Sequence, residues 1–176
     1  MEDLKVDSVI ELRSPLVEAA PYLFKLINQE RQFFERWLPW ATAIKSVKDE
    51  AFFLICAQKK IADNELWLWV IYYNQRPAGI IDLHQLDLTN CHGQIGYWLG
   101  RIYQKHGIMT ASLNKLTDYL FATDRLHRLD LLIEASNQTS YAVAQRAGFK
   151  QQTVLRDYLL RNQVFCDAIL FSKIAG

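Results

Sequence analysis

The stretch that decides the fold reads Ile95-Gly96-Tyr97-Trp98-Leu99 and continues, after a short connection, as Tyr103-Gln104-Lys105-His106-Gly107-Ile108-Met109-Thr110. Its first part predicts a strand, and its last residues open a helix after a loop that holds a glycine. At such a helix start the backbone N–H groups point outward with the positive end of the helix dipole, which forms a site for an anion such as pyrophosphate. Most strand-to-helix loops bind nothing, so this pattern alone favours anion binding and a purely structural role about equally.

The residues before this stretch predict a strand, two helical regions and a meander. Val6 to Arg13 alternates apolar and polar residues, and Ser14-Pro15 then offers an N-cap with proline at the first helical position. Ser46-Val47-Lys48-Asp49 resembles a capping box that opens another helix. The predicted elements are a strand over 6–13, helix over 16–37 with a break near 28–30, a helix over 46–63, and strands over 66–73, 78–86 and 94–99.

The residues after it predict a helix, a strand, a short helix and a closing hairpin. A helix over 107–123 carries a buried stripe of Met109, Leu113, Leu116 and Leu120. A strand over 128–134 follows, then a short helix that is capped by Ser136 or Asn137 and ends at Gly148, and then strands over 149–160 and 163–172. Helices around a mixed, largely antiparallel sheet make the fold class α/β (α+β). No linker divides the chain, so we expect residues 1–176 to form a single domain.

Composition excludes several classes of protein. The 176 residues are 51% hydrophobic and 22% charged, near the globular averages, which argues against a disordered or fibrous chain. A net charge of +1 is too small to hold nucleic acid by counterion release, so we expect no nucleic-acid partner. Three widely spread cysteines predict neither a disulfide framework nor a zinc site, and we expect no metal. With neither a signal-peptide pattern nor a long apolar run, we expect no membrane association and a cytoplasmic location.

The loop before the predicted helix matches a known coenzyme-binding motif. Gln104-Lys105-His106-Gly107-Ile108-Met109 resembles the Q/R-x-x-G-x-G/A motif of the GNAT superfamily of acetyltransferases. Longer sequence segments are similar to those of one branch, the Rim-type ribosomal-protein N-terminal acetyltransferases. Those segments are Ile95-Gly96-Tyr97-Trp98-Leu99, Gly107-Ile108-Met109-Thr110, Asn137-Gln138-Thr139-Ser140, Gly148-Phe149, Trp37-Leu38-Pro39-Trp40 and Asp167. They cover nearly the whole chain in the expected order.

The resemblance implies a GNAT fold, in which the central sheet splays open at an acetyl-CoA site. Acetyl-CoA is then the expected cosubstrate, and a homodimer is the expected assembly. The implied coenzyme contacts are Tyr97, Trp98, Leu99, Gln104, Lys105, His106, Gly107, Ile108, Met109, Thr110, Asn137 and Ser140. Among them, the Leu99 N–H is expected to polarise the thioester carbonyl, and Ser140 to donate a hydrogen bond to the departing thiolate.

The sequence departs from the family pattern in the coenzyme loop and at positions where relatives carry glutamates. Lys105 stands where the motif prefers glycine, which is tolerable if its φ is negative. Ala111 and the 156–159 stretch lack glutamates that relatives carry, so the general base does not transfer by motif. The candidates for a base, direct or through water, are Asp82, His84 and Glu65. The first two share one strand face, where such residues also serve solubility alone.

An α-amine is the acceptor that such a site favours. A pKa of ~7.8 leaves about a quarter of α-amines neutral near neutral pH, against about one in a thousand for lysines with a pKa of ~10.4. A site without a strong base can therefore acetylate an α-amine by positioning its neutral fraction. We expect an N-acetyltransferase that acts on a protein N-terminus, as in ribosomal-protein acetylation. Acetylation of a small-molecule amine (polyamine, antibiotic or amino-acid conjugate) and a non-catalytic acyl-CoA-binding domain stay open as alternatives.

Overall fold

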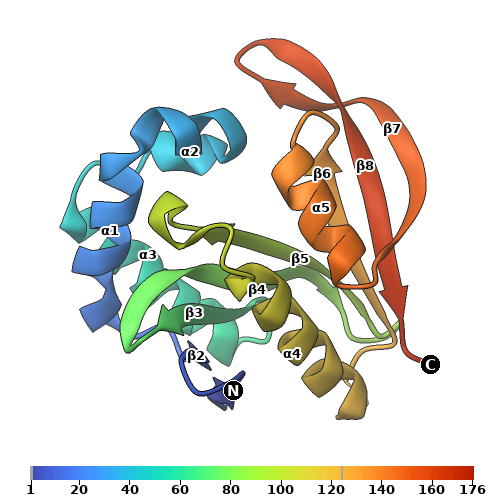
Figure 1. Cartoon of the computed structure of the whole chain (residues 1–176), viewed down its shortest axis with the longest axis horizontal. Coiled ribbons are helices and arrows are strands. Elements are labelled where there is room, and N and C mark those ends of the chain that lie inside the picture. The colour runs from blue at the N-terminus through green and yellow to red at the C-terminus, as the bar shows by residue number, and fades with distance from the viewer. Residues whose placement is uncertain (1, 124) are drawn as a thin grey trace.

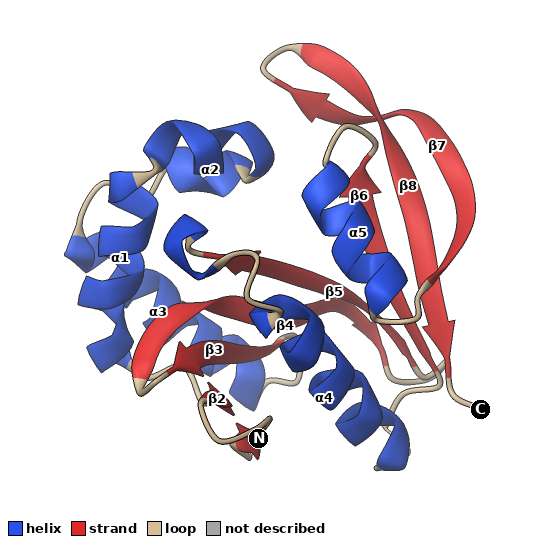
Figure 2. Ribbon diagram, in the orientation of Figure 1, coloured by secondary structure: helices blue, strands red, loops and turns tan. Residues whose placement is uncertain are grey.

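The computed structural model describes residues 2–123 and 125–176, which form one eight-stranded sheet flanked by helices (Figures 1 and 2). The strand order is β1-β2-β3-β4-β5-β6-β8-β7, and every neighbouring pair is antiparallel except β5 and β6. The strands are β1 (Leu4–Lys5), β2 (Ile10–Arg13), β3 (Trp67–Tyr73), β4 (Arg76–Asp87), β5 (His92–Leu99), β6 (Arg128–Glu134), β7 (Lys150–Arg161) and β8 (Val164–Ile174). The helical segments are η1 (Val17–Ala19), α1 (Ala20–Gln29), α2 (Arg31–Trp37), η2 (Pro39–Thr42), α3 (Val47–Ala62), η3 (Arg101–Tyr103), α4 (Ile108–Ala122) and α5 (Gln138–Arg146). The predicted fold class is confirmed.

The sheet separates two apolar cores, because alternate residues of each strand face opposite sides. One core lies under α4 and α5, where Leu113 and Leu116 pack with Ile81 and Leu131. The other lies under α1, α2 and α3. Figure 1 shows α4 and α5 on the near side of the sheet and α3 behind it. The strands between the helical layers are therefore covered on both faces, as the apolar run of β3 predicts.

The centre of the sheet splays open between β5 and β6. The two strands pair only over His92–Gln94 and Arg128–Asp130, although β5 continues to Leu99 and β6 to Glu134. On its other side β5 stays paired with β4, and the Gly100 N–H donates to the Ala78 carbonyl at 2.8 Å. Hydrogen-bonded pairs alternate in an antiparallel ladder, so this register turns the N–H groups of Tyr97 and Leu99 away from β4 and into the splay.

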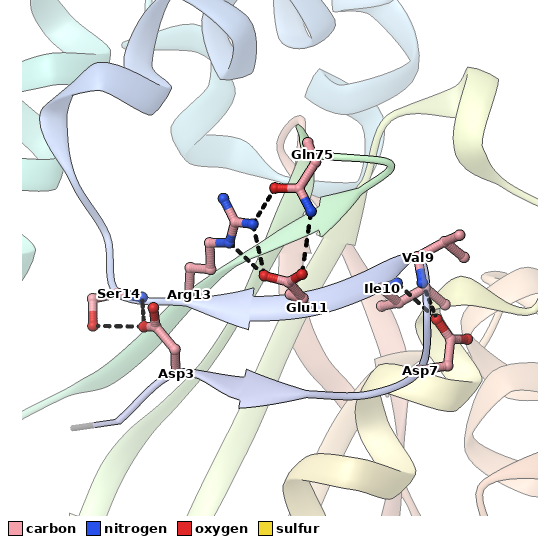
Figure 3. Close-up of polar contacts among 8 residues, drawn as sticks. All are labelled: Asp3, Asp7, Val9, Ile10, Glu11, Arg13, Ser14 and Gln75. Atoms are coloured by element: carbon pink, nitrogen blue, oxygen red, sulfur yellow. Dashed lines mark hydrogen bonds and ion pairs between the residues drawn. The ribbon is translucent and has the colours of Figure 1, made fainter.

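Two predictions near the N-terminus are wrong. Of the predicted strand over 6–13 only residues 10–13 form a strand, because the Asp7 carboxylate accepts the Val9 and Ile10 N–H groups at 2.8 and 2.7 Å and closes a turn between β1 and β2 (Figure 3). Ser14 does not cap a helix, because its N–H and hydroxyl both donate to Asp3. The helical region begins only at Val17, and α1 has its proline in the first turn.

Side-chain contacts also fix where β2 meets the turn between β3 and β4. Arg13 forms an ion pair with Glu11 at 2.6 Å, and Gln75 bonds to both of these side chains (Figure 3). The Arg13 hydrogen bond lowers the pKa of the Glu11 carboxyl. Two other caps agree with the sequence, since Ser46 accepts the Asp49 N–H at the start of α3 and Asn137 accepts the Ser140 N–H at the start of α5.

Candidate active site at the splay

A cavity of about 480 Å³ lies where β5 ends and α4 begins. We call it the helix-end cavity. It is lined by Tyr97, Leu99, Tyr103, Gln104, Lys105, Gly107, Ile108, Met109, Thr110, Thr139, Val143 and Arg146. Gly107 is the N-cap of α4 with φ +75°, no side chain caps this helix, and its first turn holds no acidic residue. The first N–H groups of α4 are therefore free to bind an anion.

The walls of the helix-end cavity refine the residue predictions. Ile108 and Met109 are 1% and 6% exposed, so their side chains belong to the core and they offer backbone N–H groups. Lys105 has φ +67°, so the negative φ that would make a non-glycine residue tolerable at this position is not found. Its backbone takes the left-handed conformation that glycine adopts without strain. His106 is exposed and lines neither this cavity nor the second one.

Sequence reasoning missed Arg146, a cation in the last turn of α5. Thr139, Val143 and Arg146 line the helix-end cavity together, and their spacings of four and three residues put them on one helix face. Helical periodicity could have signalled this face once the start of α5 was known. Arg146 and Lys105 add positive charge to a cavity that already holds the positive end of α4.

A second cavity, of about 610 Å³, opens where the splay meets the α1–α3 side of the sheet. We call it the aromatic cavity. Its lining includes Trp37, Trp40, Phe53, Trp98, Asp82, His84, Gln94, Gly96, Leu132, Glu134, Asn137, Ser140, Leu159 and Arg161. Trp98 packs edge-on against Phe34, with ring centroids 5.3 Å apart, and its ring lies on the face opposite Tyr97. The structure thus places this predicted coenzyme residue in the aromatic cavity instead.

Two of the candidate bases form one hydrogen-bonded array on the wall of the aromatic cavity. His84 Nδ1 lies 2.7 Å from Asp82 Oδ1, and His84 Nε2 lies 3.1 Å from Gln94 Nε2. Gly96 faces them on β5, where an added Cβ would come within 3.0 Å of Asp82 Oδ2. The glycine thereby leaves room for the carboxylate beside the splay. The third candidate, Glu65, is exposed and lines neither cavity.

Tyr97 is the side chain that lines both cavities. Its hydroxyl donates to the Ser140 carbonyl at 3.3 Å, which ties β5 to the start of α5 across the splay. Burial raises the pKa of Tyr97 to about 12, so the phenol stays protonated at neutral pH. Asn137 and Ser140 line the aromatic cavity, where the Asn137 side chain is engaged as the α5 cap at 3.2 Å from the Ser140 nitrogen.

The far wall of the aromatic cavity carries an ion pair that sequence reasoning also missed. Arg161 Nε lies 3.5 Å from Glu134 Oε2, joining the end of β7 to the end of β6. Both side chains are largely buried, and the Ser136 hydroxyl donates to the other Glu134 oxygen at 2.7 Å. Nothing in the sequence signals this pair, because it depends on β8 lying between β6 and β7.

Two further properties concern metals and membranes. Within residues 2–123 and 125–176, no group of three or more His, Cys, Asp or Glu side chains is placed to hold a metal ion. No helix in the described part of the chain is long and apolar enough to cross a membrane.

Comparison with known proteins matches residues 10–150 to the acetyltransferase (GNAT) domain. "Putative ribosomal N-acetyltransferase YdaF" of Bacillus subtilis (strain 168) is 31% identical over 171 residues, which are 97% of this chain and 93% of that protein. "Ribosomal-protein-serine acetyltransferase" of Escherichia coli (strain K12) is 23% identical over 98% of this chain and 97% of its own length. The crystal structure of the microcin C7 self-immunity acetyltransferase MccE, in complex with acetyl-CoA and AMP, has a TM-score of 0.95 and 28% identity over 98% of this chain and 96% of that one.

These matches agree with the geometry. The family model spans most of the chain and includes both the splay and the helix-end loop. The fold is shared with MccE over nearly the full length of both chains. This chain therefore belongs to the GNAT family of N-acetyltransferases.

Proposed function

We propose that this protein transfers an acetyl group from acetyl-CoA directly to the α-amine of a protein N-terminus. The observation that carries the proposal is the position of Tyr97, which lines both cavities beside the open splay. The two cavities therefore adjoin between β5 and β6. A thioester held from one face of the sheet and an amine held from the other can meet there, as direct transfer requires.

The helix-end cavity fits the coenzyme by charge and by shape. The free N–H groups at the start of α4, together with Lys105 and Arg146, suit a pyrophosphate. A Cβ added at Gly107 would meet no protein atom within 4 Å, so this lining residue of the cavity has open space beside it, which we call the cradle. Leu99 and Tyr97 turn their N–H groups into the splay, where an extended pantetheine arm can pair with them as a strand would.

Residues of both cavities then serve the transfer itself. Acetyl-CoA supplies an acetyl thioester, whose carbonyl carbon bonds to the amine nitrogen while the carbon–sulfur bond breaks and the amine loses a proton. The Leu99 N–H stabilises negative charge on the carbonyl oxygen. The Ser140 hydroxyl donates a hydrogen bond to the departing sulfur, and the Asp82–His84 pair accepts the amine proton, directly or through water.

Two arguments support an N-terminal α-amine as the acceptor. Such an amine has the lower pKa, so its neutral fraction exceeds that of lysine by about two orders of magnitude near neutral pH. The relatives from Bacillus subtilis and Escherichia coli both carry names that refer to ribosomal acetylation. A small-molecule acceptor with a flat ring is the second candidate, favoured by the wall of Trp37, Trp40 and Trp98 and by the AMP in the MccE complex.

The decisive experiment is a kinetic assay of acetyl transfer to matched peptides. One peptide has a free N-terminus and acetylated lysines, and the other has a blocked N-terminus and free lysines. We expect mass spectrometry to find acetylation on the first alone. Exclusive acetylation of the second, or of nucleosides that carry an amino group, would overturn the α-amine assignment.

Variants of the candidate base test the mechanism in the same assay. We expect Asp82→Asn to lower kcat by about a hundredfold, because a general base contributes about that much, while the Kd for acetyl-CoA stays unchanged. His84→Gln should lower kcat as well. His92→Gln is the matched control, since His92 lies 3.6 Å from Asp87 in a similar pair that lines neither cavity. An Asp82→Asn variant with unaltered kcat would remove this pair from the reaction.

A further inference from the structure

Arg161 stands out among the groups of the aromatic cavity that the proposed transfer does not use. It ends β7 beside the hairpin turn, and it lines the aromatic cavity. Its Nη1 donates to the carbonyl of the preceding residue, Leu160, at 3.1 Å. Among the described residues, its Nη2 makes no hydrogen bond and is not closed off from solvent.

Glu134 holds this guanidinium from behind. The side chain of Glu134 is 13% exposed and that of Arg161 is 23% exposed, so the carboxylate is the more deeply buried partner. The facing atoms, Glu134 Oε2 and Arg161 Nε, are both buried and 3.5 Å apart. Ser136 fixes the other carboxylate oxygen. The guanidinium thus has an ion-pair contact without a hydrogen bond at Nε and a hydrogen bond at Nη1, and within the described part of the chain its Nη2 has no partner.

Strand register puts Glu134 and the Asp82–His84 pair on the same face of the sheet. Gln94 and Asp130 are paired neighbours in the parallel β5–β6 ladder, and Glu134 is four residues beyond Asp130. Since side chains alternate, Glu134 faces the same side as Gln94, and so does His84, which is paired with Gln94. The aromatic cavity thus has the Asp82–His84 pair on β4, on one side of the splay, and the Arg161 guanidinium beside Glu134 on the other side.

We propose that Arg161, positioned by Glu134, binds an anionic group of the acceptor molecule, so that the favoured acceptor is an amine with a carboxylate or phosphate a few bonds away. This inference rests on the proposed function. A guanidinium donates two parallel N–H bonds to such a group and binds it more strongly than a neutral donor does. The anion can belong to an acidic residue near a peptide N-terminus or to the phosphate of a small amine.

Acceptor pairs that differ only in the anion test the inference. The peptide pair has aspartate or asparagine as its second residue, and the small-molecule pair is O-phosphoethanolamine and ethanolamine. For the wild type we expect kcat/KM to favour the anionic member of at least one pair by about tenfold or more, the usual worth of a hydrogen bond to a charged group. The pair that shows the preference identifies the source of the anion.

Variants then assign the preference to Arg161. Arg161→Gln should remove it by raising KM for the anionic member alone, Arg161→Lys should restore part of it, and Glu134→Gln should weaken it by releasing the guanidinium. The control is Arg156→Gln, an exposed arginine of the same strand outside the cavity. A thermal unfolding transition measured for each variant checks that it is folded.

Three outcomes would overturn the inference. The wild type could acetylate both members of each pair equally, or Arg161→Gln could lower activity equally on both members, which would make Arg161 structural. In these two cases the proposed function survives if the peptides are acetylated, because transfer to an N-terminal α-amine is then still measured. If the protein acetylates none of the four acceptors although it binds acetyl-CoA, the α-amine function and this inference fail together.

Discussion

Glu50 is a buried carboxylate in the first turn of α3, 1% exposed and without a hydrogen bond to either oxygen. Burial raises its pKa from 4.5 to about 7. The folded protein therefore holds the Glu50 proton more tightly than the unfolded chain does. The stability that comes from this proton is complete below pH 4.5 and is lost as the pH rises through 7.

Glu50→Gln should remove this loss of stability, because the amide keeps the shape of the protonated acid without its charge. We expect the variant to exceed the wild type in free energy of unfolding by about 3 kcal/mol at pH 8.5 and to match it near pH 4.5. Urea unfolding at the two pH values measures the difference. The control is Glu65→Gln, at an exposed glutamate. A gain that is equal at both pH values would contradict the burial argument.

At the scale of elements, the start of α4 depends on the backbone of Gly107. Gly107→Ala should strain the positive φ of +75° and add a Cβ to the cradle of the helix-end cavity. Gly148 is the matched position, because it has φ +81° and lines neither cavity. We expect each alanine variant to lose about 1–2 kcal/mol of stability, the usual cost of a left-handed residue.

Only Gly107→Ala should weaken coenzyme binding. We expect the Kd of this variant for acetyl-CoA to rise by at least about tenfold, because one good contact with the coenzyme is lost. Calorimetric titration of the two variants measures the Kd, and urea unfolding measures the shared loss of stability. Equal affinity in both variants would show that the coenzyme does not approach the backbone at Gly107.

Local patterns predict most elements of this chain. The strand over 128–134 agrees with β6 at both ends, because its alternation is regular, and α4 begins within one residue of the predicted start. The N-terminal strand and helix start were wrong because Asp3 and Asp7 compete for backbone and side-chain groups there. The hydrogen bond between Ser14 and Asp3 joins positions eleven residues apart, so the periodicity of the sequence does not reveal it.

Long-range order is what the residues alone could not predict. The place of β6 between β5 and β8 brings Glu134 to Arg161, and the packing of α5 beside the helix-end loop brings Arg146 into the cavity. Asp82 and His84 were foreseen as two separate candidates on one strand face, whereas the hydrogen bond between His84 and Gln94 depends on the β4–β5 register. The single domain and the homodimer stay predictions.

The splay predicts a pattern of amide exchange for the whole molecule. Trp98 turns its N–H toward β4, whereas Tyr97 and Leu99 turn theirs into the gap. We expect acetyl-CoA to slow hydrogen exchange at Tyr97 and Leu99 and to leave Trp98 nearly unchanged, as measured residue by residue by NMR. Equal slowing at all three amides would mean a general stiffening of β5 instead of strand-like pairing in the gap.

The alternation of β5 also bears on how this enzyme can change. Leu99 lines the helix-end cavity, Tyr97 lines both cavities, and Gln94, Gly96 and Trp98 line the aromatic cavity alone. Even positions of this strand can therefore change without altering a residue that lines the helix-end cavity. Substitutions at even positions, together with the walls that carry Trp37 and Arg161, can shift the choice of acceptor while the handling of the acetyl donor is inherited intact. A laboratory library at Trp98, Trp37 and Arg161 would explore new acceptors while it leaves both the Asp82–His84 pair and the donor half of the enzyme unchanged.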